Sequence, residues 1–91
     1  MIAKRATFEG RVQGVGFRYA AKQLAMGFDV CGTVKNLPEG TVEIELMGEE
    51  DEVDEFLTEI TEESVMAHHI KDVWVEKIDF LEGVKGFTIS S

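Results

Sequence analysis

Cysteine is almost absent from this sequence, in which Cys31 is the only one. A single cysteine can form neither an internal disulfide nor a thiolate metal cluster, so we expect a reduced, cytoplasmic protein. No apolar run approaches the roughly 18–20 residues that a membrane-spanning helix needs. The N-terminal residues also lack the apolar stretch of a signal peptide. These absences favour a protein that does not enter a membrane.

Positive charge is also scarce. The chain has 9 lysines and arginines against 18 acidic residues, which gives a formal net charge of −9 at pH 7. Such a chain is poorly suited to binding nucleic acid or an anionic membrane. The imbalance lies in residues 49–91, with three basic and thirteen acidic side chains, whereas residues 1–48 have six basic and five acidic ones. We therefore expect any anion-binding site to lie in the first half.

The length of 91 residues is that of a single domain, which we predict to span 1–91. The sequence has no linker, low-complexity tract or convincing internal repeat. Two segments have apolar residues at helical spacing. The two sets are Phe17, Ala20, Ala21, Leu24, Ala25 and Phe28, and then Val53, Phe56, Leu57 and Ile60. The acidic run at 49–52 suits the N-terminal end of the second helix, where the helix dipole is positive.

Strands are predicted where apolar and polar residues alternate, or where β-branched and aromatic residues cluster. The expected strands are residues 3–12, 29–36, 41–47, 70–80 and a short edge strand at 86–90. The alternation breaks between Ile70 and Val73, which predicts a β-bulge there. The order β-α-β-β-α-β with a final short strand is that of the ferredoxin-like split β-α-β sandwich, an α+β fold. We therefore expect an antiparallel sheet with two helices on one face.

The stretch GRVQGVGFR at residues 10–18 leads from the first predicted strand into the first helix. Gly14 and Gly16 allow the backbone to take positive φ twice, so that successive N–H groups can converge on an anion. The helix that follows directs its free N–H groups toward the same place. Arg18 lies in the first turn, where a cation opposes the helix dipole unless an anion is bound. The residues alone leave two interpretations open, a phosphate or carboxylate site and a tight turn followed by a surface arginine.

Two other glycine-rich motifs do not fit this stretch. No Lys-Ser or Lys-Thr follows the glycines, so it is not a Walker P-loop. The third glycine and the later acidic residue of a dinucleotide-binding fingerprint are also missing.

The motif at 10–18, together with GTVKN at 32–36, resembles the pair of motifs that marks the acylphosphatase family. The predicted order of helices and strands extends the resemblance over most of the chain. It implies a ferredoxin-like hydrolase that cleaves the carboxyl-phosphate anhydride of a small acyl phosphate, with no metal or other cofactor. The connection at 61–67 lacks the Gly-Pro common in the family, so the resemblance does not predict its structure.

The resemblance also implies roles for individual residues. The implied phosphate-binding loop consists of Gln13, Gly14, Val15, Gly16, Phe17 and Arg18. Its amides would bind the phosphoryl group, Arg18 would be the catalytic arginine that binds phosphate, and Asn36 would position the attacking water. Without the family, Asn36 would be interpreted as a turn residue, because asparagine is common where a hairpin turns.

Three other functions agree with parts of the pattern. A non-catalytic phosphate-binding or regulatory module could use the same fold, but it would not need Asn36 to orient water. An RNA-binding domain would need basic and aromatic residues on the open sheet face, where Glu9, Glu43 and Glu45 are expected instead. A fragment of a carbamoyl-phosphate-handling maturation protein is less favoured, because the chain starts with Met and ends soon after the last strand. We expect a monomeric enzyme, and no specificity pocket can be recognised in the sequence.

Overall fold

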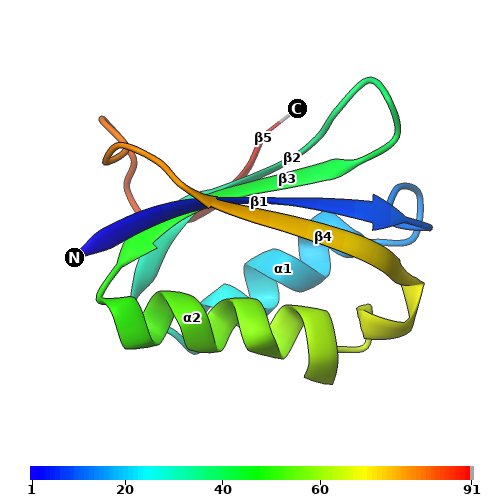
Figure 1. The fold of residues 1–91 in the computed structure, drawn as a ribbon, viewed down its shortest axis with the longest axis horizontal. Coiled ribbons are helices and arrows are strands. Elements are labelled where there is room, and N and C mark those ends of the chain that lie inside the picture. The colour runs from blue at the N-terminus through cyan, green and yellow to red at the C-terminus, as the bar shows by residue number, and fades with distance from the viewer. Residues whose placement is uncertain (91) are drawn as a thin grey trace.

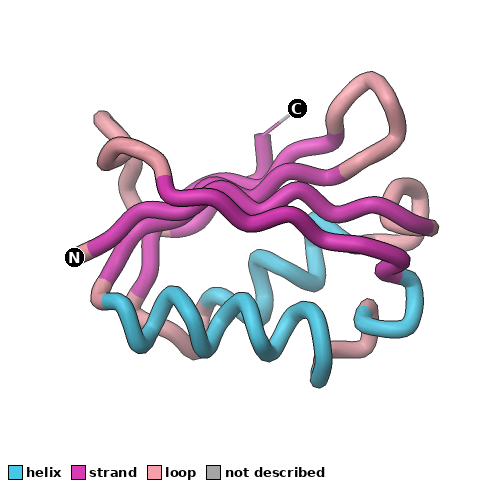
Figure 2. Tube along the Cα trace, viewed as in Figure 1, coloured by secondary structure: helices cyan, strands magenta, loops and turns pink. Residues whose placement is uncertain are grey.

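The computed structural model describes residues 1–90, which form one five-stranded sheet covered on a single face by two helices (Figures 1 and 2). The strands are β1 (Ile2–Gly10), β2 (Val30–Asn36), β3 (Val42–Gly48), β4 (Ile70–Lys77) and β5 (Phe87–Ser90). The helices are α1 (Phe17–Ala25) and α2 (Glu50–Thr58). The predicted α+β, ferredoxin-like arrangement is confirmed. No helix within residues 1–90 is long and apolar enough to cross a membrane.

The strand order in the sheet is β4-β1-β3-β2-β5. The pairs β4–β1, β1–β3 and β3–β2 are antiparallel, but β5 runs parallel to β2, so the sheet is mixed and not antiparallel throughout. The reason is the path of the chain after β4. Residues 78–86 cross the end of the sheet at which β2 begins, and a strand that starts there beside β2 must run in the same direction. The parallel pairing places Ile89 opposite Val34.

Alternating side chains in β1 and β3 form the sheet side of the core. Ala6 and Phe8 are fully buried and pair with Ile44 and Val42 in the antiparallel register. α1 packs beneath β2 and β5, and α2 beneath β1 and β3. The helices supply the buried residues Phe17, Ala21, Ala25, Val53, Phe56 and Leu57. Both predicted apolar stripes therefore face the sheet, as amphipathic helices require.

Two further sequence predictions can be compared with the structure. The pairing of Glu9 with Asp72 and of Gly10 with Ile70 leaves Lys71 without a partner, which confirms the predicted irregularity at the start of β4. The acidic residues 50–52 form the first turn of α2, where they face the positive end of the helix dipole. The connection at 59–69, which the sequence did not predict, is a π-helical turn, η1 (Glu59–Glu63), followed by a 3₁₀ turn, η2 (Ala67–His69).

Candidate active site

The loop between β1 and α1 has the backbone conformation that its glycines predict. Gly14 has φ 77° and Gly16 has φ 83°, both in the left-handed region that other residues rarely adopt. Gly16 is the N-cap of α1, and no side chain forms a cap hydrogen bond there. No acidic residue occupies the first turn of α1. The free N–H groups and the positive dipole end at the start of α1 therefore need water or a ligand as their partner.

The backbone amides of residues 13–18 have no protein partner within the described chain. Arg11 donates its N–H to the carbonyl of His69, and Ala20 donates to Gly16 as the first bond of the helix. Between them, no backbone N–H of residues 13–18 donates to an acceptor in residues 1–90. Polar groups that protein does not satisfy must meet water or a ligand. A run of amides at a left-handed turn and a helix start forms an anion-binding concavity.

Phe17 fixes the end of the loop in the core. Its side chain is 1% exposed, and its ring lies 5.1 Å from that of Phe8 between centroids. Because Phe17 points into the core, the next residue, Arg18, lies at the rim of the loop. Arg18 Nη1 donates to the carbonyl oxygen of Ser90 at 3.3 Å, which holds the guanidinium beside β5.

Asn36 reaches the same site from the other side. It is the last residue of β2, and its Oδ1 is buried with no hydrogen-bond partner among the described residues. A buried acceptor without a partner costs about 1–3 kcal/mol, so such atoms in folded proteins are expected to meet water or ligand. Arg18 and Asn36 line one cavity of about 310 Å³. Two residues that are 18 positions apart in the sequence are thus brought together, as the resemblance implied.

The cavity is not lined by all the residues that the sequence indicates. Its walls are formed by Val12, Gly14, Gly16, Phe17, Arg18, Tyr19, Asn36 and Ile89. Gln13 and Val15 belong to the loop but do not line the cavity, because Val15 packs against the core and Gln13 turns toward the β2–β3 hairpin. Sequence reasoning did not identify Val12, Tyr19 or Ile89. Tyr19 could have been suspected from its place beside Arg18, whereas Ile89 reaches the site only through the parallel pairing of β5 with β2.

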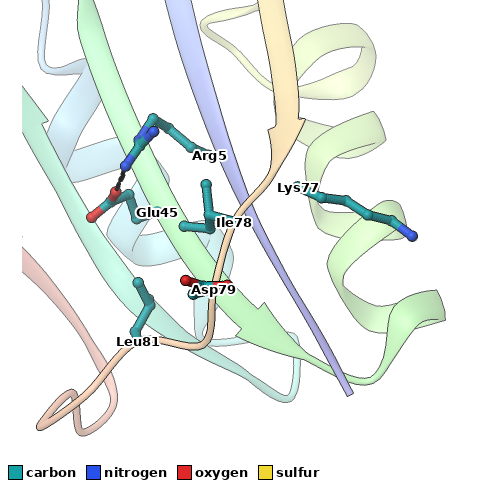
Figure 3. A pocket seen from close by; sticks show the side chains of 6 residues that line it. All are labelled: Arg5, Glu45, Lys77, Ile78, Asp79 and Leu81. Atoms are coloured by element: carbon teal, nitrogen blue, oxygen red, sulfur yellow. Dashed lines mark hydrogen bonds and ion pairs between the residues drawn. The ribbon is translucent and has the colours of Figure 1, made fainter.

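A larger cavity, of about 600 Å³, lies on the open face of the sheet and also contains an arginine (Figure 3). Arg5 is already paired there, with its Nη2 2.8 Å from the carboxylate of Glu45 and further carboxylates at 3.7 Å (Glu43) and 3.8 Å (Glu76). The hydrogen bond to Glu45 raises the pKa of Arg5 above its ordinary value. By contrast, Arg18 forms no ion pair with an Asp or Glu of residues 1–90. The smaller cavity is therefore the better anion site.

Comparison with known proteins gives a consistent result. A family model described as acylphosphatase matches residues 4–89. An acylphosphatase of Clostridium acetobutylicum is 44% identical over 80 residues, which are 88% of this chain and 87% of the relative. An acylphosphatase of Clostridium beijerinckii is 40% identical over 98% of both chains. The crystal structure of acylphosphatase from Bacillus subtilis superposes with a TM-score of 0.86 at 34% identity, and each chain covers 100% of the other.

The fold and the cavity define an α+β sandwich in which a glycine-containing loop, with amides that have no partner within residues 1–90, leads into the first helix. The chain belongs to the acylphosphatase family, whose members hydrolyse acyl phosphates. The family resemblance that the two sequence motifs indicated is confirmed.

Proposed function

We propose that this protein hydrolyses the carboxyl-phosphate bond of small acyl phosphates to a carboxylate and inorganic phosphate, in the cavity that Arg18 and Asn36 share. The observation that carries the proposal is a set of polar groups around this cavity. Within residues 1–90, its amides and Asn36 Oδ1 have no hydrogen-bond partner, and Arg18 has no acidic partner. The amides of residues 13–18 offer donors, Arg18 offers a cation, and Asn36 Oδ1 offers an acceptor. A site that only bound phosphate would need the donors and the cation but not the buried acceptor.

The loop and Arg18 bind the phosphoryl group. Phosphoryl transfer needs its equatorial oxygens held and their charge balanced, and it needs little covalent help from the protein. Fixed amides and a guanidinium meet that need without reorganising during the reaction. The guanidinium can contact two oxygens at once because its donors form a rigid fork. The bound dianion also removes the unfavourable interaction between Arg18 and the dipole of α1.

Asn36 orients the water that attacks phosphorus. Its buried Oδ1 accepts a hydrogen bond from this water, so that a water lone pair can point toward the phosphoryl group. The new bond joins the water oxygen to phosphorus, and the bond between phosphorus and the acyl oxygen breaks. The carboxylate leaves with the bonding electrons, and the proton of the water passes to the phosphate oxygens. A carboxylate is a good leaving group, which agrees with a cavity lining that contains no Asp, Glu, His or Cys within residues 1–90.

The protein acts as a single domain and a monomer in the cytoplasm under this proposal. All the residues named as binding or catalytic come from one chain, and they lie at one end of one sheet. The lone cysteine, Cys31, suits a reducing compartment. Sedimentation of the active protein would test the oligomeric state.

Hydrolysis of acetyl phosphate in the presence of EDTA tests the proposed function. We expect turnover that the chelator does not change, because the described site supplies its own positive charge through Arg18 and the loop amides. Release of inorganic phosphate above the uncatalysed rate is the measurement, and heat-unfolded protein is the blank. Absence of turnover would reject the proposal, and turnover lost only with EDTA would reject its metal-free mechanism.

A further inference from the structure

The side chain of Gln13 makes two hydrogen bonds outside the phosphate cavity. Its Nε2 donates to the carbonyl oxygen of Leu37 at 2.9 Å and to that of Thr41 at 2.7 Å. These carbonyls stand at the mouth of the β2–β3 hairpin, where Leu37 also donates its N–H to Thr41 at 2.8 Å. The side-chain NH₂ group of Gln13 therefore donates both of its hydrogens to carbonyl oxygens of the hairpin. Leu37 directly follows Asn36, so these bonds end beside the proposed water-orienting residue.

The two bonds connect the loop after β1 to the hairpin after β2, which strand pairing does not connect directly. β1 and β2 are not neighbours, because β3 lies between them. The last pair that joins β1 to β3 is Phe8 with Val42. Beyond this pair, the bonds of Gln13 are the hydrogen bonds that connect loop 11–16 to residues 37–41 within the described chain.

We propose that Gln13 is a positioning residue, which sets the place of Asn36 relative to the phosphate-binding loop. The inference rests on the proposed function, because it assigns Gln13 an effect on the attack by water. Phosphate is held by backbone amides and Arg18, so Gln13 affects the placement of water more than the binding of phosphate. Displacements of about 1 Å in such geometry cost up to about a hundredfold in rate.

The test is Gln13→Met, which keeps the approximate length of the side chain but removes both donors. We expect kcat for acetyl phosphate to fall about tenfold or more, while the inhibition constant of inorganic phosphate changes less than about threefold. If Gln13→Met folds poorly, Gln13→Asn replaces it, because its shorter amide cannot reach both carbonyls. This variant should also lower kcat while leaving the inhibition constant of inorganic phosphate nearly unchanged. Gln23→Met on the exposed face of α1 is the matched control and should not change either constant.

A double-mutant cycle with Asn36→Ala separates positioning from a general structural effect. If Gln13 acts through Asn36, adding Gln13→Met to the Asn36→Ala protein should lower kcat little further. Additive losses in kcat, or an equal loss of phosphate affinity, would overturn the inference. The same experiment tests the proposed function separately. The proposed function is rejected only if the unmodified protein does not hydrolyse acetyl phosphate.

A separate observation concerns the acyl side of the same cavity. Tyr19 and Ile89 line it and are 63% and 39% exposed, so apolar surface is available beside the phosphate loop. Within residues 1–90, Arg18 is the only charged residue of the lining, and the proposed phosphoryl group uses it. A second anionic group on a substrate would lie against apolar surface with no counter-charge, which is unfavourable. We infer that the enzyme selects acyl phosphates whose acyl group is uncharged and apolar.

Benzoyl phosphate and 4-carboxybenzoyl phosphate test this selectivity, because they differ by one negative charge on the same ring. We expect kcat/KM to be about tenfold or more higher for benzoyl phosphate. Tyr19→Ala should lower kcat/KM for benzoyl phosphate more than for acetyl phosphate, and Met26→Ala, at an exposed site near the end of α1, should change neither. Equal kcat/KM for the two benzoyl substrates, or an unchanged substrate ratio in Tyr19→Ala, would overturn the inference. Absence of all turnover would instead count against the proposed function.

Discussion

Replacing Arg18 with alanine should lower kcat/KM for acetyl phosphate by about 10³-fold or more, the scale seen when a phosphoryl-transfer site loses its arginine. The inhibition constant of inorganic phosphate should rise in the same variant. Both effects follow from the position of Arg18, the one charged side chain of the described cavity lining, at the open start of α1. Initial rates, measured with and without inorganic phosphate as inhibitor, give both constants.

Two variants sharpen this test. Arg18→Lys keeps the charge but loses the planar fork, so it should recover phosphate affinity more than rate. Arg11→Ala removes an exposed arginine from the same loop, one that does not line the cavity, and should leave both constants within about twofold. A comparable loss from Arg11→Ala would show that the net charge of the loop matters, and not the specific place of Arg18.

The features that could be predicted from sequence are those determined by neighbours in the chain. Gly14 and Gly16 have the positive φ angles expected of them because a left-handed conformation is a local property of glycine. The stripe on α1 follows from helical period, and the start of the helix follows from the loop before it. Arg18 could be singled out because its charge is unfavourable at that end of a helix.

The features that could not be predicted depend on segments distant in sequence. Ile89 reaches the cavity because residues 78–86 cross the sheet and β5 pairs in parallel with β2. The bonds of Gln13 require the loop after β1 to meet the hairpin after β2, across the first residues of β3. No local pattern in an otherwise ordinary glutamine specifies such a contact. The role that the family resemblance implies for Gln13 belongs to its backbone amide, and it says nothing of where the side chain points.

The buried oxygen of Asn36, which has no partner within residues 1–90, favours the functional interpretation of this residue over the turn interpretation. A turn asparagine is favoured because its side chain satisfies nearby backbone groups. Asn36 Oδ1 is buried and accepts no hydrogen bond from residues 1–90, so it provides none of that stabilisation. A buried acceptor without a partner is unfavourable, whereas one that accepts a hydrogen bond from water is not. An unfavourable buried oxygen that the fold does not need is consistent with a role for Asn36 in the reaction.

Asn36→Ala should therefore lower kcat by about 10²–10³-fold, a loss of the size found when a single preorganised polar group of an active site is removed. The inhibition constant of inorganic phosphate should stay within about threefold, because the loop amides and Arg18 remain in place. The free energy of unfolding should not fall, because the substitution removes a buried acceptor that has no partner in the described protein. Steady-state rates, phosphate inhibition and urea unfolding measure the three quantities.

Lys35→Ala is the control for a change at the end of β2. Its side chain pairs with Glu43 at 3.7 Å on the open face of the sheet, one residue before Asn36. It should leave kcat within about twofold, since exposed ion pairs contribute little. If Asn36→Ala instead lost phosphate affinity and rate together, Asn36 would be a phosphate ligand and not the residue that orients water. If it lost stability and kept its rate, the turn interpretation would be the correct one, because only a turn residue stabilises the fold without contributing to the attack of water.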